Sequence, residues 1–97
     1  MVFSPKARAN LDDLLEYLES KWSVKVKKEF IKKLDRSVYR ISDFPNSCPQ
    51  SDEIPGLFKC VVTKQTSFIY RIKGGEIEIV LLFDNRLDPK KIRRSKE

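Results

Sequence analysis

Residues 67–83 read SFIYRIKGGEIEIVLLF, and this stretch decides the fold. Apolar and polar side chains alternate on both sides of Gly74-Gly75, as they do in strands that bury one face. Two adjacent glycines supply the left-handed backbone conformation that a tight hairpin turn requires. The stretch therefore predicts an antiparallel pair of strands over 67–73 and 76–83, and a similar run at 57–63 predicts a third strand.

The alternation places the side chains of these strands on two faces. One face is apolar, and we expect helices to cover it. Its members are Phe58, Cys60, Val62, Phe68, Tyr70, Ile72, Ile77, Ile79, Leu81 and Phe83. The other face carries Lys59, Arg71 and Glu78 among apolar side chains. Lys59 and Glu78 have two interpretations: a cross-strand ion pair on a solvated face, or part of a site that acts on a phosphate group.

Upstream of the strands, two amphipathic segments predict a helical hairpin. The first helix begins at Ser4-Pro5, because Ser caps a helix well and Pro fits the first helical position, and it spans 5–20. The second helix follows Ser23 and spans 24–43. It ends at Phe44-Pro45, because proline disfavours a helical conformation in the residue before it.

The remaining segments are short or irregular. Residues 1–3 are long enough only for a short strand, and the proline-containing stretch 45–56 predicts a loop. We expect Trp22 and the phenylalanines in the core, as is typical of large aromatic residues. Of the two cysteines, Cys60 is predicted to be a small core residue and Cys48 a loop thiol.

Composition limits the class of protein and its chemistry. The chain has 97 residues, 40% of them hydrophobic and 35% charged, which predicts one soluble globular domain over 1–97. The longest apolar run, 79–83, is far shorter than the ~20 residues of a membrane span. No apolar secretory segment begins the sequence, so we expect a cytoplasmic protein without a membrane partner. The sequence has no histidine and two cysteines, which predicts neither a metal site nor a cofactor.

Positive charge is concentrated in two segments. The net charge is +6, from 20 basic and 14 acidic side chains. Residues 21–36 hold seven of the basic and two of the acidic side chains, and the tail 88–97 holds five and two. Each segment is either a solvated surface or a contact for an acidic protein segment or a nucleic acid. Tyr39, off the apolar stripe of the second helix, has no assigned role.

The order of these elements and several short sequence words resemble the RelE/ParE superfamily of bacterial type II toxin–antitoxin toxins. The resemblance covers nearly the whole chain. The words are Val2-Phe3-Ser4-Pro5-Lys6-Ala7, Asp13-Leu14, Tyr17-Leu18, Gly56-Leu57-Phe58-Lys59, Phe68-Ile69-Tyr70-Arg71-Ile72, Glu76-Ile77-Glu78-Ile79 and Asp84-Asn85-Arg86-Leu87-Asp88-Pro89. The resemblance implies an α+β fold of order β-α-α-β-β-β, with the helical hairpin packed on an antiparallel sheet.

The superfamily implies two kinds of action. Its RelE-like branch cleaves messenger RNA on the ribosome without a metal, and its ParE-like branch poisons DNA gyrase. Lys59 and Arg86 match two basic positions of the RelE motif. The second lysine, the strand arginine and the C-terminal tyrosine of that motif fall on Val61, Ser67 and Ile92. The departures favour the ParE-like branch.

Chemical reasoning about RNA cleavage agrees with that preference. Attack by the 2′-hydroxyl needs a base and an acid, and without histidine the base would be a carboxylate or a lysine. Arg71 and Arg86 would stabilise the charge on the phosphate. We therefore expect a ParE-like toxin, with toxicity depending on surfaces such as Arg93 and Arg94. The alternatives are an mRNA endonuclease with Lys59, Arg71 and Arg86 as catalytic residues, and a degenerate toxin or basic nucleic-acid-binding module. Whether the chain is an enzyme stays open.

The resemblance also implies partners. We expect a cognate antitoxin whose C-terminal segment orders as it wraps the toxin, and an acidic segment would be attracted by the net charge of +6. The expected target is DNA gyrase, or the ribosome and its mRNA in the alternative. The assembly is a homodimer or a toxin–antitoxin hetero-oligomer.

Overall fold

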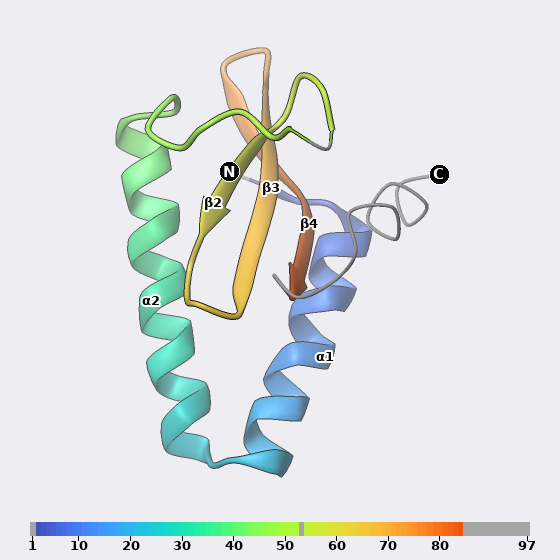
Figure 1. Ribbon diagram of the computed structural model, residues 1–97, viewed down its shortest axis with the longest axis vertical. Coiled ribbons are helices and arrows are strands. Elements are labelled where there is room, and N and C mark those ends of the chain that lie inside the picture. Colours follow the sequence, from blue (N-terminus) through green and yellow to red (C-terminus); the bar gives the residue numbers. More distant parts are fainter. Residues whose placement is uncertain (1, 53, 85–97) are drawn as a thin grey trace.

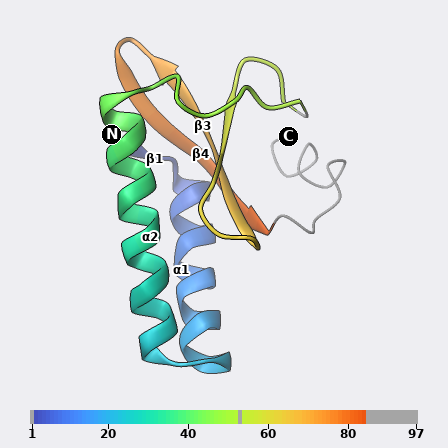
Figure 2. The same ribbon diagram turned by 60° about the vertical axis from the view of Figure 1, so that its left-hand side comes forward.

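The computed structural model describes residues 2–52 and 54–84, which form a helical hairpin and a sheet (Figure 1). The elements are β1 (Val2–Phe3), α1 (Pro5–Lys21), α2 (Val24–Asp43), β2 (Phe58–Val61), β3 (Thr66–Lys73) and β4 (Glu76–Asp84). The predicted order β-α-α-β-β-β and the α+β fold are confirmed. Figure 2 shows both helices on one side of the sheet. No helix in the described ranges is both long enough and apolar enough to cross a bilayer.

The sheet is mixed, and in this it differs from the antiparallel sheet predicted from the sequence. Its order is β1-β4-β3-β2. The pairs β2–β3 and β3–β4 are antiparallel, as predicted, but β1 pairs with β4 in parallel, with Phe3 opposite Ile79. Between β1 and β4 the chain passes through the helical hairpin, β2 and β3, and a long connection of this kind permits parallel pairing.

Each helix begins at the serine that the sequence indicates. The Ser4 hydroxyl oxygen accepts a hydrogen bond from the backbone N–H of Ala7 at 3.0 Å, with Pro5 in the first turn. The same hydroxyl donates to the backbone carbonyl of Val80 at 2.8 Å, which ties the start of α1 to β4. Ser23 caps α2 in the same way by accepting from Val26. The hairpin is thus anchored to the sheet at one end.

A β-bulge in β4 changes which residues face the helices. The register pairs Ile69 with Leu81 but Tyr70 with Ile79, so Val80 is an extra residue on its strand. An extra residue reverses the alternation of side chains beyond it. The prediction that Leu81 faces the helices is therefore wrong.

Phe83 is also misplaced by the sequence pattern, and Leu82 takes the core position instead. The helix side of the sheet holds the larger core, whose buried members are Ala7, Phe30, Leu34, Ile41, Cys48, Cys60, Phe68, Tyr70, Ile77, Ile79 and Leu82. The opposite side holds a second, smaller core of Ile54, Leu57, Ile69, Leu81 and Phe83. The loop between α2 and β2 supplies two of these residues, so the loop covers part of the sheet's outer face.

Three expected core residues lie at the surface. Trp22 is 68% exposed and Phe44 is 67% exposed, while Ile72 is 40% exposed near the end of β3. Trp22 caps the C-terminal end of α1 and Phe44 that of α2. At the end of a helix a side chain loses the cover of a following helical turn, so both aromatic residues stay largely in contact with solvent. Counting the aromatic residues of the chain thus overestimates how many side chains the core contains.

Candidate functional site

The outer face of the sheet places two of the predicted catalytic residues together. Lys59 in β2 and Arg71 in β3 project on this face, and both are half-buried. Arg71 lies opposite Glu78 of β4, and its Nε is 2.6 Å from Glu78 Oε1. The Lys59 ammonium lies 5.5 Å from the centre of the Phe83 ring, which is a cation–π distance. Arg86, the third predicted catalytic residue, lies outside the described residues.

The ion pair on this face differs from the predicted one. Glu78 pairs with Arg71 and not with Lys59, because Lys59 lies one strand further away, opposite Ile69. The Arg71 guanidinium is therefore already neutralised by a carboxylate. The carboxylate occupies the Nε–H and offsets the positive charge, so Arg71 would stabilise the charge of a phosphate less than an arginine without such a partner would.

A hollow of about 420 Å³ adjoins the Arg71–Glu78 pair. It is bounded by the start of α1 and by β4, with Lys6, Ile54 and Val80 among its lining residues. Its polar groups are one ion pair, one lysine and the Ser4 hydroxyl that caps α1. Among the described lining residues, Lys6 and Arg71 are cations that can attract an anion, and none carries an imidazole that could act as a general base.

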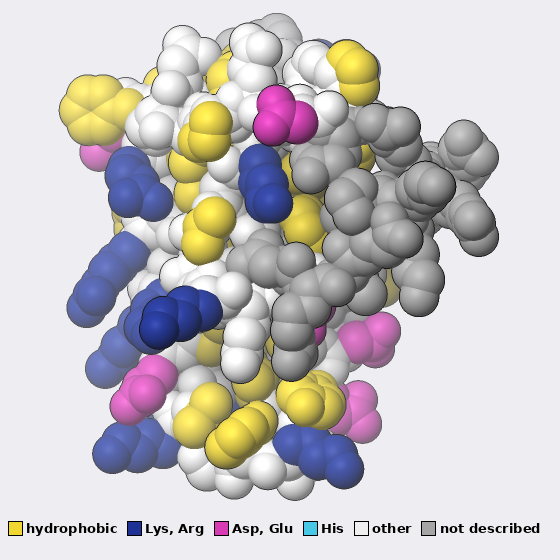
Figure 3. Space-filling view, in the orientation of Figure 1, with side chains coloured by type: hydrophobic (Ala, Val, Ile, Leu, Met, Phe, Trp, Pro, Cys, Tyr) yellow, Lys and Arg dark blue, Asp and Glu magenta, His cyan; other side chains and the backbone are white. Residues whose placement is uncertain are grey.

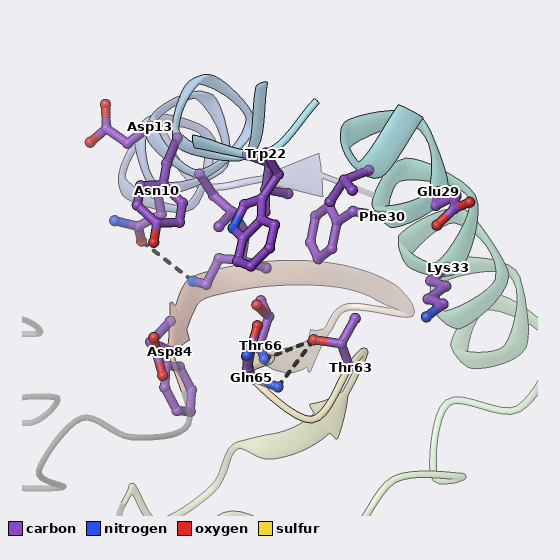
Figure 4. A pocket seen from close by; sticks show the side chains of 16 residues that line it. Asn10, Asp13, Trp22, Glu29, Phe30, Lys33, Thr63, Gln65, Thr66 and Asp84 are labelled. Carbon is purple, nitrogen blue, oxygen red and sulfur yellow. Dashed lines mark hydrogen bonds between the residues drawn. The ribbon is translucent and has the colours of Figure 1, made fainter. Parts of the chain in front are cut away.

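A second hollow, which we call the hairpin groove, lies between the two helices and the turn that joins β2 to β3. Its volume is about 460 Å³. Figure 4 shows Trp22 and Phe30 directed from the helices toward the strands, with Glu29 and Lys33 at one side. Its wall contains both aromatic and charged side chains, namely Asp13, Tyr17, Trp22, Glu29, Phe30, Lys33, Phe83 and Asp84.

The sequence pattern does not predict the hairpin groove. Its one signal was Trp22, a large aromatic residue where the apolar stripe of α1 ends, which was interpreted as core. The partial burial of the leucines of α1 also indicates the groove, but only once the structure is known. Leu11, Leu14, Leu15 and Leu18 pack against the core but are only partly buried. The described chain therefore leaves the inner side of the hairpin incompletely covered.

Basic side chains form a stripe along α2. Lys25, Lys28, Lys32 and Arg36 are exposed and recur at the helical spacing of three or four residues. Figure 3 shows lysine and arginine side chains gathered along the α2 side of the molecule. Tyr39, which is 73% exposed, continues the stripe. This basic stripe adjoins the hairpin groove, because Lys33 and Glu29 of the same helix lie in the groove wall.

Two thiols and a phenol, those of Cys48, Cys60 and Tyr70, are buried in the larger core on the helix side of the sheet. The Tyr70 hydroxyl donates to the carbonyl of Pro45 at 2.7 Å, and burial raises the pKa of Tyr70. Burial also raises the pKa of the Cys60 thiol to about 11, with a further contribution from Cys48 and an opposing one from Arg40. Cys60 is a core residue, as predicted, and Cys48 is a loop residue that is also buried.

Fold and surface define a class of small α+β protein: a helical hairpin on a four-stranded sheet, with a groove between the helices and a basic stripe along α2. The solved structure "Chromosomal ParDE TA system from P. aeruginosa" contains a chain of the same fold. The two superpose with a TM-score of 0.73, covering 86% of this chain and 91% of that one, at 20% sequence identity. At this identity the likeness concerns the fold.

Sequence comparison identifies the family. The family described as "ParE toxin of type II toxin-antitoxin system, parDE" matches residues 1–88, and the chain belongs to this toxin family. Two similar relatives are named Toxin ParE1, from two strains of Mycobacterium tuberculosis. Each is 29% identical over 89 residues, which cover 90% of this chain and 90% of the relative. The expected RelE/ParE-superfamily membership and the preference for the ParE-like branch are confirmed.

Proposed function

We propose that this ParE-family toxin inhibits growth through contact with a protein target, and that the target is DNA gyrase, as the family resemblance implies. One observation carries the proposal: on the outer sheet face, Glu78 holds the Arg71 guanidinium in an ion pair at 2.6 Å. Cleavage of a phosphate ester depends on preorganised donors that stabilise the charge of the transition state. An arginine whose charge is offset by a carboxylate serves this role less well. The face therefore suits a structural role better than a nuclease role.

Burial at a second position supports the same conclusion. The strand arginine of the RelE motif corresponds to Ser67, which is fully buried. A longer, charged side chain at this position would have to enter the protein interior, at a large desolvation cost. The sheet of this toxin is thus built with a small residue where the nuclease branch needs an exposed cation.

Induction of the chain in a susceptible bacterium tests this proposal. We expect growth to stop with messenger RNA intact and with an SOS response from broken DNA. Arg71→Ala should leave both readouts unchanged, as should the control Lys73→Ala, which removes an exposed cation from the same strand. Messages cut within translated codons, with the cutting abolished by Arg71→Ala and not by Lys73→Ala, would contradict the proposal.

The partner we propose is a cognate antitoxin with a C-terminal segment of mixed character. The hairpin groove offers aromatic side chains. Its lining also includes three acidic residues, Asp13, Glu29 and Asp84, against one basic residue, Lys33. An acidic segment would be repelled there and attracted to the basic stripe of α2. The segment therefore places apolar side chains in the groove and its acidic side chains along α2, and it orders as it binds.

Co-expression with the neighbouring reading frame tests the partner. We expect a stable complex of toxin and antitoxin, and its loss when Tyr17→Asp and Trp22→Asp place charges in the hairpin groove. The matched control is Phe44→Asp, which changes an equally exposed aromatic residue at the end of α2 and should leave the complex intact. A complex that survives the groove variants would show that the segment binds elsewhere.

The second candidate is a metal-independent mRNA endonuclease with Lys59, Arg71 and Arg86 as catalytic residues. The observation in its favour is that Lys59 and Arg71 share one sheet face and that Arg71 lines the hollow of about 420 Å³. Under this alternative, Lys59→Ala and Arg86→Ala lower codon-positioned cleavage by orders of magnitude, as loss of charge-stabilising donors does. A chain that binds antitoxin but neither cuts RNA nor affects growth would be a degenerate toxin.

A further inference from the structure

The loop between α2 and β2 runs alongside β2 in the antiparallel direction. Gln50 pairs with Phe58 in an isolated antiparallel bridge. The backbone N–H of Lys59 donates to the carbonyl of Pro49 at 2.9 Å. Continuing this register by two residues brings the loop cysteine opposite the strand cysteine, Cys48 opposite Cys60. The sequence separates the two thiols, and the pairing of loop and strand brings them together.

Hydrogen bonding shows which kind of antiparallel position the cysteines occupy. Ser51 N–H donates to the Leu57 carbonyl at 2.7 Å, and Lys59 N–H donates to the Pro49 carbonyl. Between these two bonded pairs lies the non-bonded pair Gln50–Phe58, and continuing the alternation makes Cys48 opposite Cys60 the next non-bonded position. Non-bonded partners have Cα atoms ~4.5 Å apart with side chains close together, which lies within the range that a disulfide spans.

Side-chain contacts agree with this register. Cys48 and Cys60 belong to the same core cluster, and they are 7% and 1% exposed. Hydrogen bonding with the Cys48 side chain contributes to the raised pKa of Cys60. Arg40 Nη2 lies 3.8 Å from the Cys60 sulfur and would stabilise a thiolate there. The two cysteines thus lie in one buried cluster at facing positions of the loop and the strand, and both are reduced in this structure.

We propose that Cys48 and Cys60 form a reversible intramolecular disulfide with a small disulfide such as glutathione disulfide as the oxidant. The Cys48 thiolate, the more exposed of the two, attacks one sulfur of glutathione disulfide, and a glutathione thiolate leaves. Cys60 loses its proton to solvent and attacks the Cys48 sulfur of the mixed disulfide, which releases the second glutathione. Two protein thiols are oxidised, and one glutathione disulfide is reduced to two thiols.

The bond would fasten the loop to the edge strand β2. Because Ile54 and Leu57 of this loop cover the outer core, the disulfide restrains the segment that shields the sheet face carrying Lys59. It closes a short loop, and cross-links of this kind stabilise a fold by restricting the unfolded chain. The redox state of the thiols thus sets how readily the outer face opens.

Peptide mapping and thermal unfolding of the full chain test the proposal. After equilibration with glutathione disulfide and non-reducing proteolysis, we expect a peptide that links Cys48 to Cys60. The midpoint of thermal unfolding should rise by roughly 5–15 °C, and dithiothreitol should reverse the rise. Cys48→Ser should give neither the linked peptide nor the rise, while Ser47→Ala, a neighbouring exposed substitution, should give both.

A second measurement separates this geometry from the chance pairing of two thiols on a chain. In mixtures of reduced and oxidised glutathione, the equilibrium constant for the internal disulfide should be at least ~10-fold larger in native buffer than in urea, since the fold holds the thiols together. Equal constants in the two conditions would overturn the proposal. Exclusive formation of intermolecular dimers or glutathione adducts by the folded chain would do the same.

Discussion

Arg71 lies opposite Glu78 across β3 and β4, and this register position governs what the basic sheet face can do. A half-exposed pair of this kind contributes little to stability, roughly 0–1 kcal/mol. Its consequence is chemical: the guanidinium has a carboxylate partner, and Lys59 lies against the Phe83 ring. The basic side chains of this face are therefore engaged with the protein itself.

At the same scale, the buried hydroxyl of Tyr70 is expected to stabilise the fold. It donates to the Pro45 carbonyl where α2 ends, and the ring is fully buried. Tyr70→Phe removes the donor and leaves a carbonyl without it, so we expect a loss of roughly 1–2 kcal/mol in the free energy of unfolding. Urea unfolding measures this loss. Tyr39→Phe, at a position that is 73% exposed, should fall within experimental error; equal losses in the two variants would contradict the assignment.

Cys60 predicts a pH dependence of stability. Its pKa rises from 9.0 to about 11 in the fold, chiefly because burial disfavours the thiolate. The folded state therefore holds this proton more tightly than the unfolded state. The stabilisation is complete below about pH 9 and declines as pH rises toward about 11, with a slope of at most about 1.4 kcal/mol per pH unit.

Urea unfolding over this alkaline range measures the effect of Cys60. Other groups also ionise at alkaline pH, so the informative quantity is the difference in slope between the native chain and Cys60→Ala. We expect the variant to lose stability with pH less steeply, even if it is less stable overall. Identical slopes would show that Cys60 ionises equally well in both states.

At the scale of elements, the start of α1 is the joint between the hairpin and the sheet. Ser4 caps the helix and also donates to Val80 in the β4 bulge, whereas Ser23 only caps α2. Loss of a serine cap costs about 1 kcal/mol, and Ser4→Ala loses a hydrogen bond in addition. We expect Ser4→Ala to destabilise the protein more than Ser23→Ala does in urea unfolding. A larger loss of stability in Ser23→Ala than in Ser4→Ala would contradict the assignment of Ser4 as the joint between the hairpin and the sheet.

Element order could be predicted from the sequence because the signals for it are local. Ser4-Pro5 marks one helix start, Phe44-Pro45 a helix end and Gly74-Gly75 a hairpin turn, and the structure has each feature at that place. The bulge at Val80 has no local signal, since Ile79–Phe83 is uniformly apolar and fits either face. Strand register beyond a bulge depends on tertiary packing, so the second core was not predicted.

The candidate site shows the same limit. Lys59 and Arg71 were correctly predicted to share a face, because alternation along a strand is a local property. Which cation pairs with Glu78 depends on the order of the strands in the sheet, and that order comes from the fold as a whole. The hairpin groove likewise exists because two helices and a turn meet there, so Trp22 could not be placed from its own helix.

For the whole molecule, charge distribution predicts how the antitoxin associates. Lys25→Glu combined with Lys32→Glu reverses two charges of the basic stripe on α2. We expect a several-fold lower association rate with the antitoxin, and a weaker dependence of that rate on salt, because the stripe would attract the proposed acidic segment at a distance. Stopped-flow kinetics at two ionic strengths measure both quantities.

The control for this prediction changes the net charge by the same amount as the pair on the stripe does. Lys6→Glu combined with Lys73→Glu reverses two exposed charges at sites away from α2. This pair should reduce the association rate less than the pair on the stripe does. If both pairs slow association equally, the overall charge of +6 and not the stripe determines the encounter.

The proposal that this ParE-family toxin acts on DNA gyrase by protein contact can be tested with purified components. The toxin is added to gyrase, supercoilable plasmid and ATP, with and without the antitoxin. We expect supercoiling to fall and broken plasmid DNA to accumulate, and the antitoxin to prevent both. Gyrase that supercoils normally at saturating toxin, while the same preparation cuts messages within codons in a translating extract, would contradict the claim.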